Sequence, residues 1–286
     1  MVRWARAVGV GLTLGLAACA MEGDPETTMR ELRVLALTSV PAEPAPGETV
    51  ILGVEVVDPL GEGADLAVWA CTPVDGRCLE AGPPDQPVGA FSFVARGVEA
   101  RASGALTVPA ALAFAIEEAP VDELPIALWA LACVPGRCPV IDDLDAAPEA
   151  GSPAWAALID TLSDPFGLAG GLPIAGTSLA SRRLIVSNRE AEERNAGPMI
   201  VPATEAVPQV EAEGSTLLRV ELSGATLVVP TTTRGAFEFA AYDAEGEDTL
   251  DLRWFGGDEP GEADIVVVAQ DEAGAQAVWR VRGEVE

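Results

Sequence analysis

The feature that most constrains the fold is an alternation of apolar and polar side chains that recurs along much of the chain. In residues 49–57, valine or leucine occupies every second position, and Glu55 lies on the opposite side. Successive side chains of a strand point to opposite faces of its sheet, so this period is typical of a strand with one buried face. The pattern favours sheets over helices.

Segments with strand character recur between clusters of proline and glycine such as residues 41–47. Many short strands with turn signals between them predict an all-β fold built from sandwiches. We therefore expect two β-sandwiches in tandem, residues 31–187 and 201–286, joined by a charged linker at 188–200. The expected strands are 31–40, 49–57, 66–72, 89–94, 101–108, 125–134, 182–187, 217–222, 225–229, 236–241, 249–255, 264–269 and 276–281.

Two stretches resemble known domain families. A strand, the turn Pro46-Gly47 and a second strand, followed by a strand with Trp69, resemble the start of immunoglobulin-like domains of bacterial surface proteins. Residues 266–279, with an Asp271-to-Gly274 turn and then Trp279, resemble the last hairpin of PKD-like or cadherin-like domains. Both resemblances imply immunoglobulin-like sandwiches, and neither implies a particular function.

One helix is expected in an insertion of the first sandwich at about residues 139–176, and the alanine-rich residues 109–118 are expected to form a short helix or a loop. Ser152 and Pro153 are typical of a helix start, with serine as the cap and proline at the first helical position. Apolar residues then follow at helical spacing, on a face that we expect to pack on the sandwich, with binding of a partner as the alternative. These residues are Trp155, Leu158, Ile159 and Leu162.

The first eighteen residues are typical of an export signal. Arg3 and Arg6 precede an apolar run, residues 8–16, which is too short to span a membrane as a helix. The run ends in Leu16-Ala17-Ala18-Cys19, which resembles the lipobox of bacterial lipoproteins. The resemblance implies cleavage after residue 18, lipid on Cys19, including acyl chains such as palmitate, and a tether over residues 19–30. Alanine at position 20 favours the outer membrane.

Composition excludes several classes of chemistry. The chain has no histidine, and all its cations are arginines, so histidine-dependent catalysis, histidine-ligated metals and lysine Schiff bases are excluded. Its formal net charge of −28 argues against binding nucleic acid, which depends on cationic contacts to phosphate. We therefore expect no enzyme activity and no nucleic-acid partner.

Besides Cys19, the chain has four cysteines: Cys71, Cys78, Cys133 and Cys138. An even number in an exported chain predicts two disulfides. The segments Trp69-to-Cys78 and Trp129-to-Cys138 share one pattern, a tryptophan, a cysteine, a short turn and Gly-Arg-Cys. The expected pairing is Cys71 with Cys78 and Cys133 with Cys138. Pairing of Cys71 with Cys133 and Cys78 with Cys138 stays open.

Three acidic clusters invite comparison with calcium sites, since calcium binds carboxylate oxygens on loops. None follows the spaced aspartate pattern of a calcium-binding loop, so we expect solvated acidic loops and no cofactor. The cluster at 142–145 opens the insertion. The weak calcium candidates are Asp243, Glu245, Asp248, Asp258 and Asp264.

Taken together, these patterns predict a non-catalytic, lipid-anchored envelope protein. Its expected role is a surface or periplasmic module that binds an unidentified protein partner or spaces one from the membrane. The first alternative is a carbohydrate-binding module, and the second is a hydrolase with paired carboxylates. We expect Trp69, Trp129, Trp254 and Trp279 to anchor the cores, and an exposed tryptophan would favour carbohydrate binding.

Overall fold

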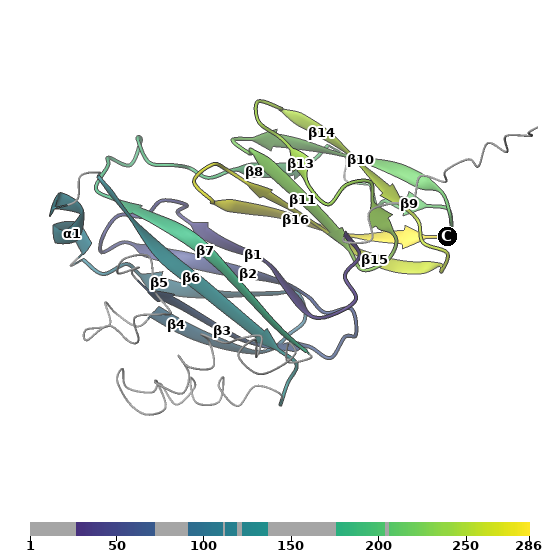
Figure 1. Ribbon diagram of the computed structural model, residues 1–286, viewed down its shortest axis with the longest axis horizontal. Helices are drawn as coiled ribbons and strands as arrows, with labels where there is room; N and C mark the ends of the chain where they lie inside the picture. The colour runs from purple at the N-terminus through teal and green to yellow at the C-terminus, as the bar shows by residue number, and fades with distance from the viewer. Residues whose placement is uncertain (1–26, 72–90, 111, 119–121, 137–175, 204–205) are drawn as a thin grey trace, which may run out of the picture.

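The computed structural model describes residues 27–71, 91–110, 112–118, 122–136, 176–203 and 206–286, with the backbone alone at 69–71, 91–94, 118 and 179. The fold is all-β, as the alternation predicts, and Figure 1 shows strands in layers along the whole molecule. The described part contains one helix, α1 (Leu112–Glu118). The predicted insertion helix at 153–164 lies outside the described residues.

The first sandwich has two antiparallel sheets. One contains β1 (Arg33–Val40), β2 (Thr49–Val57) and β5 (Arg101–Thr107), in the order β1-β2-β5. The other contains β3 (Ala64–Cys71), β4 (Phe91–Val98), β6 (Glu123–Cys133) and β7 (Thr177–Ser187), in the order β4-β3-β6-β7.

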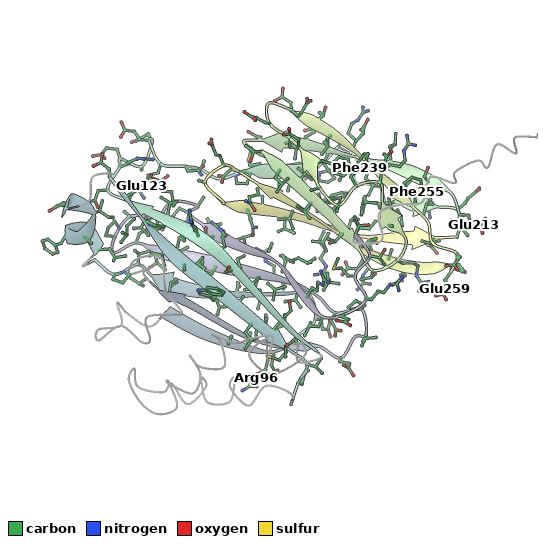
Figure 2. All side chains as sticks on the ribbon, in the orientation of Figure 1. Arg96, Glu123, Glu213, Phe239, Phe255 and Glu259 are labelled. Atoms are coloured by element: carbon green, nitrogen blue, oxygen red, sulfur yellow. The ribbon has the colours of Figure 1, made fainter. Side chains whose placement is uncertain are left out.

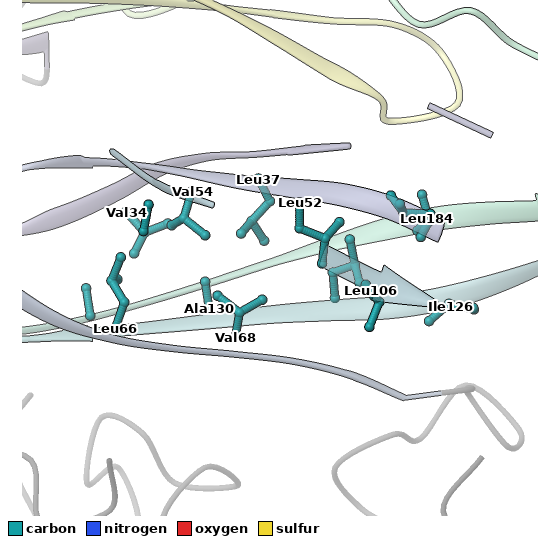
Figure 3. Packing of buried hydrophobic residues seen from close by; sticks show 14 of the residues in the cluster. Val34, Leu37, Leu52, Val54, Leu66, Val68, Leu106, Ile126, Ala130 and Leu184 are labelled. Atoms are coloured by element: carbon teal, nitrogen blue, oxygen red, sulfur yellow. The ribbon is translucent and has the colours of Figure 1, made fainter. Parts of the chain in front are cut away.

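Aliphatic side chains fill the space between these two sheets. Val54 and Leu52 of one sheet face Leu66 and Val68 of the other, and all four are buried (Figure 3). Because leucine and valine pack densely and carry no polar atom, this core needs no internal hydrogen bonds. The described side chains of the first core cluster include no aromatic ring.

Buried Arg182 closes the gap between β1 and β7, which are not paired in one sheet. Its guanidinium donates hydrogen bonds to the Leu37 carbonyl oxygen and, at 2.9 Å, to Ser39 Oγ. Burial lowers the pKa of Arg182 to about 10, and the carboxylate of Asp271 opposes that shift. The edge of β1 is therefore covered inside the molecule and is not available for pairing with another chain.

The second sandwich also has two sheets. One contains β12 (Ala236–Phe237), β14 (Thr249–Phe255), β10 (Ser215–Ser223) and β8 (Met199–Pro202), in that order. The other contains β13 (Tyr242–Asp243), β11 (Leu227–Thr232), β15 (Gly261–Gln270), β16 (Gln276–Val285) and β9 (Gln209–Val210), in that order. Strand β9 runs parallel to β16, and the other strand pairs are antiparallel.

Aromatic residues fill the second core. Trp254 and Phe237 are fully buried, and the indole N–H of Trp254 donates to the Arg234 carbonyl oxygen at 3.1 Å. A buried tryptophan needs such a partner for its N–H. The prediction that Trp254 anchors a core is confirmed, whereas Trp279 is half-buried and packs at the edge of this core.

The expected core position of Trp129 is wrong. Its neighbours Leu128 and Ala130 point into the first core, so alternation places Trp129 on the opposite face of β6, where it is half-buried. The register pairs it with Trp69 of β3, so the two segments with the shared pattern lie side by side. Nothing is described of the Trp69 side chain.

Two further expectations need correction. The strand expected at 236–241 is strand only at 236–237 (β12), which pairs with β14. The chain then crosses to the other sheet, where 242–243 (β13) pairs with β11. The tether expected over 19–30 ends earlier. Thr27 and Met29 are buried, and Thr27 Oγ1 accepts the Phe237 N–H at 2.8 Å. The packed part of the chain thus includes Thr27, on the second sandwich.

Candidate functional site at the joint between the sandwiches

The two sandwiches are packed on each other across a joint with an apolar centre. Ala36 and Val57, on the outer face of β1 and β2, contact Val266 and Val268 of β15. Met29 completes this buried cluster from the segment before β1. Because apolar surface is removed from water on both sides, the contact stabilises one arrangement of the two sandwiches.

Arg280 of β16 forms the polar part of the joint at one end. It donates to the carbonyl oxygens of Val56, at 2.8 Å, and Ala100, at 3.0 Å, both in the first sandwich. It also forms a two-point ion pair with Asp264 of its own sheet. One side chain therefore bridges the two sandwiches with charge-assisted hydrogen bonds.

Glu55 of β2 lies beneath Arg280 and is almost fully buried. Its carboxylate is 3.7 Å from Arg280 and 3.2 Å from Arg101. Burial raises the pKa of Glu55, and the two arginines oppose this rise. The loss of hydration outweighs the attraction of the two arginines, so the charged form of this carboxylate is less favourable here than in water.

A second set of polar contacts fixes the other end of the joint. Asn195 Nδ2 donates to Asp271 of the second sandwich at 2.6 Å, and the Asn195 N–H donates to Glu43 of the first at 2.8 Å. Nearby, the Leu37 N–H donates to Gln276 Oε1 across the joint at 2.9 Å. The linker expected at 188–200 is therefore fastened to both sandwiches.

A groove of about 480 Å³ opens beside Arg280, between the sandwiches. Within the described residues, no group of three or more carboxylates or cysteines is arranged to hold a metal ion. Arg280 neutralises the carboxylate of Asp264 and also donates to two carbonyl oxygens of the first sandwich, so its charge is already used in holding the sandwiches together. The charged residues that line the groove are Asp58, Glu99, Glu262, Asp264, Arg280 and Arg282.

The five calcium candidates do not converge on one site. The loop with Asp243 and Glu245 adjoins the start of β11, since the Ala244 N–H donates to the Thr226 carbonyl oxygen. Asp264 lies at the other end of β11, where its carbonyl oxygen accepts the Thr233 N–H. Asp258 and Asp248 are exposed. Asp258 and its neighbour Glu259, labelled in Figure 2, come just before Gly261, which pairs with Val285 near the end of β16.

The register of β3 and β6 decides one question about the cysteines. Cys71 lies opposite Ala127, and Cys133 lies opposite Asp65, so the two cysteines are at opposite ends of the pair, about 20 Å apart. Disulfide-bonded cysteines have Cα atoms within about 7 Å of each other. The alternative pairing of Cys71 with Cys133 is therefore excluded.

The remaining connectivities are not distinguished. Cys133 is fully buried and disulfide-bonded. Its partner is not among the described side chains, because Cys78, Cys138 and the side chain of Cys71 lie outside them, as does Cys19. Pairing of Cys71 with Cys78 and of Cys133 with Cys138 stays a prediction.

The sequence contained one signal for the joint that alternation alone missed. Residues 265–269 of β15 are apolar without interruption, which is typical of a strand buried on both faces. In the structure, Ile265 and Val267 point into the second core, whereas Val266 and Val268 point into the joint. Glu55 and Arg280 gave no such signal, because charged residues at alternate positions usually face water.

Comparisons with known proteins do not identify a family. No family model and no curated protein matches the chain. Among solved structures, it is similar to latent dimeric PorU from Porphyromonas gingivalis, with 8% identity over 90% of this chain and a TM-score of 0.25. The adhesin InvE from Yersinia pseudotuberculosis shows 11% identity over 87% and a TM-score of 0.21.

A third similar structure is a glycosyl hydrolase family 2 member from Bacteroides cellulosilyticus, with 11% identity over 84% of this chain and a TM-score of 0.22. The chain spans 24%, 58% and 23% of the length of these three proteins. Similarities this distant support no functional argument.

Proposed function

We propose that this chain is a non-catalytic, lipid-anchored envelope protein, whose two sandwiches form one fixed arm. The observation that carries the proposal is the joint, where an apolar cluster lies between two sets of polar contacts. A fixed joint suits a spacer, because it holds the far end of the arm at a constant distance and direction from the point of attachment.

The attachment point of the arm follows from the lipobox and from Thr27. Lipid on Cys19 anchors the protein to a membrane, in this proposal the bacterial outer membrane. Residues 20–26 then connect the anchor to Thr27, a span of at most about 25 Å. Thr27 packs against Phe237, so the second sandwich is the one nearer the membrane. No helix in the described ranges is long and apolar enough to cross a membrane.

The anchor is tested by replacing Cys19. In the wild-type protein, we expect metabolically labelled palmitate on the peptide that begins with Cys19, and recovery of the chain with membranes. Cys19→Ala should carry no label and leave the membrane fraction. Ser152→Ala, which changes no lipobox residue, is the control. Labelled palmitate elsewhere, or an unlabelled wild-type chain, would refute the anchor.

One observation favours the alternative of carbohydrate binding. Half-buried Trp279 lines a groove of about 180 Å³ together with Val207, Gln209 and Arg219. An aromatic ring beside polar side chains can stack on a sugar ring. Isothermal titration with soluble polysaccharides tests this alternative: heat of binding that Trp279→Ala abolishes and Phe255→Ala leaves would support it over the spacer.

A further inference from the structure

The end of the first sandwich that lies away from Thr27 is built from four segments. They are α1, the turn at 44–48, residues 122–123 and the loop at 188–194, while Glu43 and Asn195 at their borders belong to the joint. Asn188 joins two of them, since its side chain donates to the Ala113 carbonyl oxygen of α1 and its N–H donates to the Asp122 carbonyl oxygen. We call this set of segments the distal end.

The distal end lies far from the proposed membrane attachment. Strand β1 runs from Arg33, soon after Met29, to Val40 beside the turn at 44–48, and its eight residues rise by about 26 Å. Figure 1 shows α1 and the C-terminus at opposite ends of the long axis of the molecule. In the proposed arm, the distal end is thus the part that a partner would meet first.

Exposed apolar side chains lie on this end and next to it. Phe114 of α1 is 72% exposed, while Leu112 and Ile116 hold the helix on the first core. Val40 and Ile51 lie directly opposite each other on β1 and β2 and are 69% and 48% exposed. Large apolar side chains that gather in exposed positions mark interaction surfaces.

The charge at the distal end is acidic. Its two arginines are already paired, Arg189 with Glu123 at 2.8 Å and Arg194 with Glu48 at 2.7 Å. Figure 2 shows Glu123 beside α1. Five further carboxylates here are exposed and have no ion-pair partner within the described ranges: Glu117, Asp122, Glu190, Glu192 and Glu193.

We infer that the distal end is a docking surface for a basic protein segment, with Phe114 as its apolar anchor. The inference rests on the proposed function and names the partner class. Arginine or lysine side chains of the segment would meet the five free carboxylates, and an apolar side chain would cover Phe114. A second copy of this chain is a poor occupant, because two chains of net charge −28 repel each other.

Fluorescence anisotropy with a labelled decapeptide of alternating leucine and arginine tests the inference on the full membrane-extracted protein. We expect binding that weakens at least tenfold in Phe114→Ala. The triple variant Glu190→Gln, Glu192→Gln, Glu193→Gln should weaken it similarly and reduce its salt dependence, because the attraction is electrostatic. A peptide of leucine and glutamate should not bind.

The second sandwich supplies matched controls. Phe239 is 53% exposed, and Glu245 and Glu247 are exposed acids on a loop. Phe239→Ala and the double variant Glu245→Gln, Glu247→Gln should bind the peptide as the wild type does. Equal losses in these controls would show non-specific attraction to an acidic protein and overturn the inference.

Three further outcomes would also overturn the inference: no binding of the basic peptide, unchanged binding by Phe114→Ala, or self-association in sedimentation that Phe114→Ala abolishes. Membrane retention is measured on the same samples. If the protein stays anchored while any of these outcomes occurs, the docking surface fails and the proposed arm stands.

Discussion

The outer face of β1 and β2 has two halves that differ in their surroundings. At one half, Ala36, Glu55 and Val57 are buried beneath the second sandwich. At the other, Val40 and Ile51 of the same strands are exposed. Period-two alternation assigns all five side chains to one face. The comparison teaches that alternation identifies a face, while packing between domains decides which part of that face is core.

The largest expected difference between the halves comes from placing a charge in each. Val57→Asp puts a carboxylate into the apolar cluster, with no arginine in that cluster to pair with it. We expect it to lower the free energy of unfolding by about 3–5 kcal/mol. Ile51→Asp, on the same strand and the same face, should cost less than about 1 kcal/mol, because water reaches it. Urea unfolding measures both, and equal losses would mean that the covered half is not buried.

The second prediction compares the stability lost when a bridging arginine and a surface arginine are replaced. Arg280→Ala removes bonds to two backbone carbonyls and leaves buried Glu55 with less compensation, so we expect a loss of about 3 kcal/mol. Arg219 pairs with Asp251 on the exposed face of the second sandwich. Arg219→Ala should leave stability nearly unchanged, because solvent screens an exposed ion pair. Thermal unfolding that shows equal effects would contradict the bridging role of Arg280.

The smallest expected effect is a difference in pH dependence. The pKa of Glu55 is raised by burial, so the folded chain binds this proton more tightly than the unfolded chain. Stability from this group is full below its ordinary pKa of 4.5 and decreases as pH rises toward the raised value. Glu55→Gln should remove this decrease, so its stability relative to the wild type should rise with pH across that window.

Asp251, on the exposed face of the second sandwich, should show a pH dependence of stability opposite in sign to that of Glu55. A hydrogen bond from Arg219 lowers the pKa of Asp251, so its contribution is present above 3.8 and is lost as pH falls through the lowered value. Asp251→Asn should therefore lose stability relative to the wild type as pH rises from the lowered value to 3.8, and the difference should be constant above that pH. Parallel pH profiles for Glu55→Gln and Asp251→Asn would contradict the difference between buried and exposed carboxylates.

The sequence predicted much of the fold but little of the joint. The limits of β2 and β14 agree with the expected strands at 49–57 and 249–255, because clear alternation and flanking breakers define both. Trp129 was misplaced because an aromatic residue on a strand does not reveal which face is covered. Arg280 and Glu55 lie far apart in the chain, so only tertiary packing brings them together.

The fixed joint is tested most directly by residual dipolar couplings, measured on the backbone amides of both sandwiches in one weakly aligned sample. The account predicts that a single alignment tensor fits the couplings of β1–β7 and β8–β16 together, with the orientation seen in the structure. Two tensors of different magnitude would show that the sandwiches move independently, and the fixed arm would then be wrong.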